Sequence, residues 1–201
     1  SYLVIDGKKY YAFHDDSTNK VQNAGVYTCR LPNATDKGRN IDLAMRGGNL
    51  GIKTGVAHRF SLSDGKILLH GSVDEGTMEA IRHYPQTDIP FYAMSTIDSN
   101  FHQSLLEQIN EQIRGCSEKE AVARILHFVQ YAFDYATDGE QHGYEKPYFI
   151  EENFYYPKND CEDRAILFAF LVRNVLRLDV HLVQYPGHEC TAVNFSTSQM
   201  N

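Results

Sequence analysis

The sequence predicts an α+β protein in which a β-rich N-terminal part precedes a part made of helices and then strands. Residues 1–75 contain short alternating apolar runs separated by Asp-Gly pairs. Residues 98–177 carry apolar residues at helical spacing, and residues 180–195 alternate again. Strands and helices that occupy separate stretches of a chain are typical of α+β folds.

Two stretches of the N-terminal part have the pattern of a β-hairpin. In "YLVIDGKKYYAF" the pair Asp6-Gly7 separates two apolar runs, which is a strong signal for a hairpin with a two-residue turn. In "HRFSLSDGKILLHGSV" the pair Asp64-Gly65 repeats the pattern. The segment "MRGGNLGIKTG" between them lacks the phosphate-binding patterns GxxxxGK[ST] and GxGxxG, so we interpret it as a connector.

Two amphipathic helices are expected next. Asp98 or Ser99 caps the start of the first, and Gly115 ends it. Ser117 and Glu120 form a capping box that opens the second. The apolar faces are expected to consist of Phe101, Leu105, Leu106, Ile109 and Ile113 in the first helix, and of Val122, Ile125, Leu126, Val129 and Phe133 in the second.

A tyrosine-rich irregular segment, residues 138–159, then leads to a third helix. The segment either crosses a functional site or covers an edge of the core, and its length does not decide between the two. The third helix is apolar all round from residue 165 to residue 172, which predicts a buried central helix. The strands "VHLVQY" and "CTAVNF" follow, joined by Pro186-Gly187. We expect full burial of Phe168, Leu171, Val172 and Val175.

The composition excludes some classes of partner. The chain of 201 residues has a net charge of −7 and no basic run, which argues against nucleic acid. Its apolar runs are all shorter than the ~20 residues of a transmembrane helix, so we expect no transmembrane segment. The first residues lack the features of a signal peptide, and a periplasmic or secreted location would require a removed export signal. The sequence assigns neither a compartment nor an oligomeric state.

Cys161 and His188 are the candidate catalytic residues. Asp160 has the chemistry of a helix N-cap, which places Cys161 in the first turn of the buried helix. Free backbone N–H groups and the helix dipole favour a thiolate there, and the same groups can donate to an oxyanion. The charges of Glu162 and Asp163 oppose thiolate formation. His188, just after the Pro-Gly turn, is placed to act as the base.

Two other interpretations stay open from the residues alone. Cys161 is an inert buried cysteine in one of them. In the other, His188 and Cys190 share one face of a strand and bind zinc together with Cys161. Structural zinc normally takes four ligands in closely spaced pairs, and the second pair is absent. We therefore expect no metal and no organic cofactor.

The segment "NDCEDRAILFAFLVRNVLRLDVHLVQYPGH" resembles the central signature of the transglutaminase-like superfamily of papain-fold cysteine enzymes. It has the Asp-Cys-Glu-Asp start, the apolar helix with an Arg near its end, and the strand followed by a His. The resemblance covers about residues 98–195 and is strongest to the bacterial members, which include predicted cysteine peptidases and amidases.

This resemblance implies a papain-like core of helices packed on an antiparallel sheet. The core would span residues 91–201 and follow a β-rich module of residues 1–90. Cys161 would be the nucleophile and His188 the base. In the family, the third residue of the catalytic triad is an Asp on the strand after the His. The 13 residues after His188 contain no Asp, so we expect a core truncated at its C-terminal end. Asp15 and Asp16 are remote candidates for that role.

The function expected from these features is hydrolysis of amide or peptide bonds through a Cys-His dyad and an acyl-enzyme intermediate. The chain contains no Trp to match the oxyanion-stabilising Trp of true transglutaminases, which favours hydrolysis over cross-linking. The expected partner is a peptide or another amide-bearing substrate of unspecified identity. The alternative is a catalytically weak or inactive binding or structural module that retains the fold.

Overall fold

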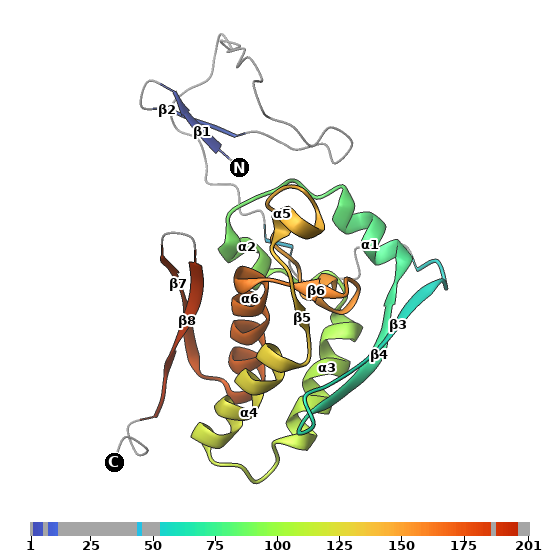
Figure 1. The fold of residues 1–201 in the computed structure, drawn as a ribbon, viewed down its shortest axis with the longest axis vertical. Helices are drawn as coiled ribbons and strands as arrows, with labels where there is room; N and C mark the ends of the chain where they lie inside the picture. The colour runs from blue at the N-terminus through green and yellow to red at the C-terminus, as the bar shows by residue number, and fades with distance from the viewer. Residues whose placement is uncertain (1, 6–7, 12–43, 46–52, 186–187, 197–201) are drawn as a thin grey trace.

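The computed structural model describes residues 2–5, 8–11, 44–45, 53–185 and 188–196. Figure 1 shows helices gathered around a central helix, with small two-stranded sheets at the periphery. The fold is therefore mixed α+β, as the order of sequence patterns predicts. Within the described ranges, no helix is long and apolar enough to cross a membrane.

The expected hairpins are present, with one difference in turn length. β1 (Tyr2–Ile5) pairs antiparallel with β2 (Lys8–Tyr11), while the Asp6-Gly7 turn and Asp15 and Asp16 lie outside the described residues. β3 (Ala57–Ser63) pairs antiparallel with β4 (Leu68–Asp74). Residues 64–67 connect these strands, so the turn is longer than the two residues that the pattern predicts. Asp64 Oδ1 stabilises this turn by accepting the backbone N–H groups of Lys66 at 2.9 Å and Ile67 at 2.7 Å.

The outer edge of β4 is covered by two glutamine side chains of α3 (Ser99–Gln112). Gln112 accepts the backbone N–H of Leu68 and donates to its carbonyl, both at 2.8 Å. Gln108 does the same with His70, both at 3.1 Å. Gln108 and Gln112 are one helical turn apart on α3, and this separation matches that of His70 and Leu68, which are two residues apart on β4. Each glutamine side-chain amide makes the backbone hydrogen bonds that a neighbouring strand would otherwise make with this edge of β4.

Two short helices follow the β3–β4 hairpin in a region without a predicted helix. α1 (Glu75–Arg82) begins directly after β4, and its N-cap Asp74 accepts the backbone N–H of Gly76 at 2.8 Å. α2 (Ile89–Met94) has a proline in its first turn and contacts the central helix.

The predicted caps of the two amphipathic helices are confirmed. Asp98 caps α3 by accepting the backbone N–H groups of Asn100 and Phe101. Ser117 and Glu120 form the capping box of α4 (Glu118–Tyr131). The apolar face of α4 is buried as expected except at Leu126, which is 39% exposed, so its expected burial is wrong.

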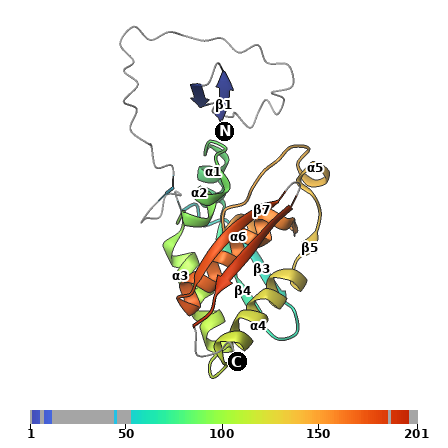
Figure 2. The same cartoon turned by 90° about the vertical axis from the view of Figure 1, so that its left-hand side faces the viewer.

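The central helix α6 (Cys161–Leu171) is buried on all sides from residue 165 onward. It continues into a π-helical turn, η3 (Val172–Leu176), in which Val175 is only half-buried, against expectation. β7 (Asp179–Tyr185) and β8 (His188–Asn194) pair antiparallel and lie against one side of α6 (Figures 1 and 2).

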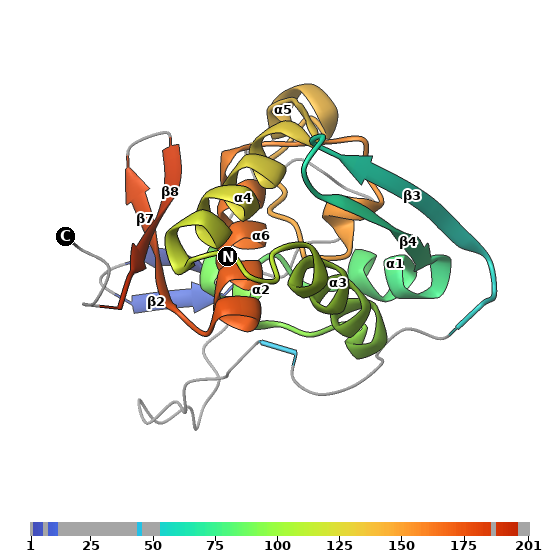
Figure 3. The same ribbon diagram turned by 90° about the horizontal axis from the view of Figure 1, so that it is seen from below.

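A single hydrophobic cluster joins most of these elements. It contains apolar side chains of β4, α1, α3, α4 and α6, and Figure 3 shows the β3–β4 hairpin beside α3. The cluster is continuous across residues 90 and 91, where the sequence predicts a domain boundary. The boundary itself stays a prediction.

The tyrosine-rich segment contributes to both the core and the candidate site. It contains α5 (Asp138–Gln141), the 3-10 turn η2 (Glu152–Phe154) and β6 (Lys158–Asn159). β6 pairs in parallel with β5 (Asp134–Tyr135). The buried aromatic and aliphatic side chains of the segment are Tyr148, Phe149, Ile150 and Phe154.

Leu171→Ala should destabilise the protein by about 2–5 kcal/mol, because Leu171 is fully buried and its truncation leaves a cavity. Urea denaturation measures this change in the free energy of unfolding. Leu126→Ala makes the same chemical change on an exposed face, and we expect a loss below about 1 kcal/mol. Equal losses in the two variants would contradict a central position for α6.

Candidate active site

The N-terminal end of α6 is held by its neighbours through Arg164. Its guanidinium group donates to Asn159 Oδ1 at 2.9 Å and to the Phe133 carbonyl at 3.0 Å. Asn159 is buried in β6 and donates in turn to Asn153 Oδ1 at 2.9 Å. These bonds fix the start of α6 relative to the end of α4 and to the β5–β6 pair. Cys161 therefore occupies a defined position, although it is the first residue of its helix.

Asp160 is the N-cap of α6, as the sequence predicts. Asp163, three residues later, accepts the backbone N–H of Asp160 at 3.3 Å, so the two residues form a capping box. Asp163 also accepts the backbone N–H of Tyr148 at 2.8 Å. The buried carboxylate of Asp163 thus connects the helix start to the tyrosine-rich segment.

The Cys161 thiol is half-buried and donates to Glu162 Oε2 at 3.1 Å. Burial, followed by the hydrogen bond and charge of Glu162 and the charge of Asp160, raises the pKa of Cys161 to about 11. The backbone N–H of Glu189 acts in the opposite direction and lowers the pKa of Cys161. The free N–H groups of the helix start, which the sequence analysis expected to favour a thiolate, are outweighed by burial and by the adjacent carboxylates.

The structure brings the start of β8 to Cys161, but the His188 ring is not the group in contact with the sulfur. Strand alternation buries Glu189 and exposes His188. Among the described residues, no hydrogen bond joins the imidazole of His188 to Cys161 Sγ. Burial raises the pKa of Glu189, and its Oε2 has no hydrogen-bond partner in the described part of the chain. Glu189 is therefore a site residue that sequence analysis missed.

Tyr135 is a second residue that sequence analysis missed. It is 56% exposed, and the guanidinium of Arg164 lies 5.2 Å from the centre of its ring. Burial, followed by the charges of Cys161, Asp160 and Glu162, raises the pKa of Tyr135. Its register opposite Asn159 in the parallel β5–β6 pair places it beside the start of α6. This pairing has no local sequence signal, because each strand contains only two residues.

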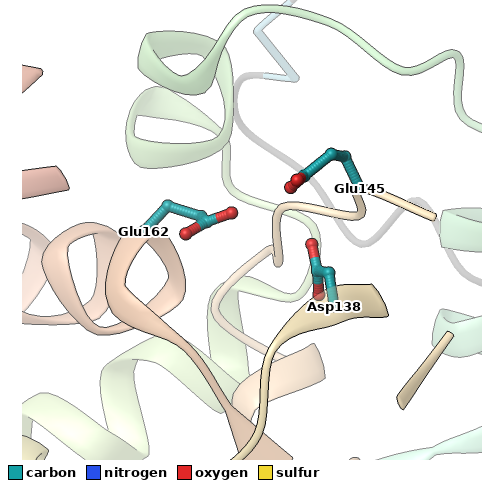
Figure 4. Close-up of side chains that lie close together, drawn as sticks. All are labelled: Asp138, Glu145 and Glu162. Atoms are coloured by element: carbon teal, nitrogen blue, oxygen red, sulfur yellow. The ribbon is translucent and has the colours of Figure 1, made fainter. Parts of the chain in front are cut away.

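Carboxylate groups gather beside the thiol. Figure 4 shows the side chains of Asp138, Glu145 and Glu162 pointing toward one another from α5, the following loop and α6. One carboxylate oxygen from each of these residues lies within 4.8 Å of the other two, and the same holds for the buried group of Asp138, Asp160 and Asp163. Asp138 also accepts the backbone N–H of Lys146.

Burial and the neighbouring carboxyl groups raise the pKa values of Asp138, Asp160 and Asp163. Burial is the largest cause for Asp138, whose pKa rises to about 7, and the charges of Asp160 and Glu162 add to it. Burial and the adjacent Glu162 carboxyl raise the pKa of Asp160 to about 7. Burial and the charges of Asp160 and Asp138 raise the pKa of Asp163 well above its usual range. The site therefore accumulates uncompensated negative charge as the pH rises.

Oxygen ligands of this kind suit a hard divalent cation such as Ca²⁺ or Mg²⁺. Asp160 is 5% exposed, and its Oδ1 has no hydrogen-bond partner in the described part of the chain. This oxygen is therefore available to coordinate a cation together with the carboxylates of Asp138 and Asp163. The zinc arrangement of Cys161, His188 and Cys190 is not among the potential ligand groups that the described residues form.

Scans of protein-family models, of curated proteins and of solved structures found no match to this chain.

Asp138→Asn should flatten the pH dependence of stability. A carboxyl group with a pKa raised from 3.8 to about 7 stabilises the fold below pH 4, and this stabilisation is lost as the pH rises to about 7. With a chelator present, the variant should exceed the wild type in unfolding free energy by about 1–3 kcal/mol at pH 8 and by much less at pH 4. Urea denaturation across this range measures the effect.

The same substitution at the exposed Asp179 is the matched control for a general charge effect. A similar flattening in both variants would contradict the assignment to the buried cluster.

Millimolar Ca²⁺ should raise the Tm of the wild type at pH 7.5, because a ligand that binds only the folded state stabilises it. The double variant Glu145→Gln/Glu162→Gln should lose this rise, because it removes two of the three converging carboxylates. Glu111→Gln, at an exposed position of α3, is the control. Thermal unfolding with no effect of Ca²⁺, or with an equal effect in all variants, would remove the carboxylates from consideration as a cation site.

Proposed function

We propose that the protein is a cysteine-dependent hydrolase of amide or peptide bonds. Cys161 attacks the carbonyl carbon, and His188 takes the thiol proton and returns it to the leaving amine. Water then attacks the acyl-enzyme and releases the acid. The observation that carries this proposal is the half-buried thiol at the first turn of α6, the buried helix against which β8 packs.

The arrangement around Cys161 provides groups for each step of this reaction. The first N–H groups of α6 have no partner within the helix and are suited to hold an oxyanion. Tyr135 is exposed beside the thiol, where a substrate can contact its ring and hydroxyl. His188 is the first residue of β8, next to the turn that joins β7 to β8.

The alternative is a binding or structural module with little turnover. Two observations favour it. The pKa of Cys161 is raised to about 11, so the thiol is protonated at neutral pH. The imidazole of His188 is also exposed and makes no hydrogen bond to the sulfur within the described ranges.

Site-resolved alkylation by iodoacetamide across pH separates the two functions. The hydrolase should show a Cys161 alkylation rate that is already substantial at pH 7, because His188 draws off the thiol proton. His188→Ala should lower this rate and the rate of amide hydrolysis, the latter by about 10²–10⁴-fold. His181→Ala, at an exposed position of β7, is the matched control.

An alkylation rate that rises steadily toward pH 11 in the wild type and in both variants would support the binding module instead. Mass spectrometry of the alkylated peptides distinguishes Cys161 from Cys29, Cys116 and Cys190.

A further inference from the structure

A cavity of about 460 Å³ lies between α3 and the C-terminal end of α6. Its walls include side chains of both elements, among them Leu106 of α3 and Phe170 of α6. Cys161 is the first residue of α6 and lies at the opposite end of the helix, so this cavity is separate from the candidate active site. A volume of this size is in the usual range of small-molecule sites.

The backbone at the cavity wall departs from regular helix. α6 widens into the π-helical turn η3, in which Asn174 Nδ2 donates to the Phe170 carbonyl at 2.8 Å. Arg177 follows with φ of 59°, a left-handed conformation that disfavours residues with a side chain. π-helical turns and such residues are frequent at functional sites. Their effect here is to place Val175 and Arg177 in the cavity wall.

A buried pair supports the wall on the α3 side. His102 is 5% exposed, and its Nε2 lies 3.0 Å from Glu151 Oε1, which also accepts the backbone N–H of Asp98 at 2.8 Å. The His102 ring contacts Phe170 in an edge arrangement, with 4.7 Å between ring centres. The imidazole lines the cavity as a polar group beside the aromatic ring of Phe170.

Opposite charges lie on the two sides of the cavity. Glu107 extends from α3, where it accepts a hydrogen bond from Gln103 at 2.8 Å. Arg177 extends from the segment after η3, and it makes no ion pair among the described residues. Apolar side chains of both elements, Leu106 and Val175, line the space as well. A ligand that matches this wall has an anionic end, a cationic end and an apolar side chain.

We propose that this cavity binds a short peptide with free amino and carboxyl ends. Arg177 binds the carboxylate through its guanidinium, and Glu107 binds the ammonium. Phe170 and Leu106 contact the apolar side chain of the peptide. The proposal does not depend on any reaction at Cys161, because the two sites lie at opposite ends of α6.

Calorimetric titration of the whole chain with three related peptides tests the proposal. Ala-Phe carries both charges, Ala-Phe-amide lacks the carboxylate, and N-acetyl-Ala-Phe lacks the ammonium. Ala-Phe should bind the wild type, and the affinity for each blocked peptide should be lower by a factor of about ten or more. Arg177→Gln should abolish the preference for Ala-Phe over its amide and retain the preference over the acetylated peptide. Glu107→Gln should do the reverse.

Arg173→Gln and Glu111→Gln are the matched controls, because they remove the same charges at exposed positions outside the cavity wall. Cys161→Ala should leave the affinity for Ala-Phe unchanged. NMR of the His102 imidazole gives a second readout in the wild type and should show a shift on binding. Absence of binding at millimolar Ala-Phe, equal affinity for all three peptides, or loss of binding in Cys161→Ala would each overturn the proposal.

Discussion

The structure depends on one constraint, a helix that has no polar face. From Ala165 to Leu171 every side chain of α6 is apolar and buried, so each direction around the helix must be covered by another element. α2, α4, β7 and β8 all contact it. None of these elements could bury as much apolar surface alone, and the hydrophobic effect therefore assembles them around the same axis. The small sheets at the periphery are a consequence, because a central helix leaves no room for a wide central sheet.

Burial of the helix also determines the chemistry at its start. The start of α6 lies inside the protein, where Asp160 and Asp163 form a capping box that satisfies the backbone N–H groups of these two residues. These acids are themselves buried, and their neighbours Asp138 and Glu162 add further charge. The carboxyl groups that accept hydrogen bonds at the helix start also carry negative charge, and this charge disfavours a thiolate at the adjacent Cys161. A cation in the cluster, or a base that removes the thiol proton, would relieve this conflict.

The local features of the fold could be predicted from the sequence because each rests on residues close together in the chain. The caps at Asp98, Ser117 and Asp160 are examples, because a capping side chain bonds to backbone groups two or three residues away. The burial of α6 follows from its composition alone. Val175 departs from that pattern because the π-helical turn rotates it away from the face that a regular helix would present.

The candidate site was less predictable because it depends on segments that meet only in the folded chain. Tyr135 is placed beside the start of α6 by the parallel β5–β6 pair, whose two-residue strands carry no periodic signal. Which of His188 and Glu189 is buried on β8 depends on the register of the strand, because a shift of one residue exchanges the two faces of a strand. Asp138 and Glu145 come from an irregular segment, where spacing along the chain does not indicate proximity in space.

The glutamine pair on α3 gives the hairpin an unusual dynamic property. The amide protons of Leu68 and His70 belong to a strand at the edge of a two-stranded sheet, where exchange with solvent is normally fast. Here each is bonded to a helix side chain instead of a strand. Their exchange therefore reports separation of the hairpin from α3, whereas the amides bonded between β3 and β4 report opening of the hairpin itself. Separation of the hairpin from α3 and opening of the hairpin itself can therefore be observed separately in this protein.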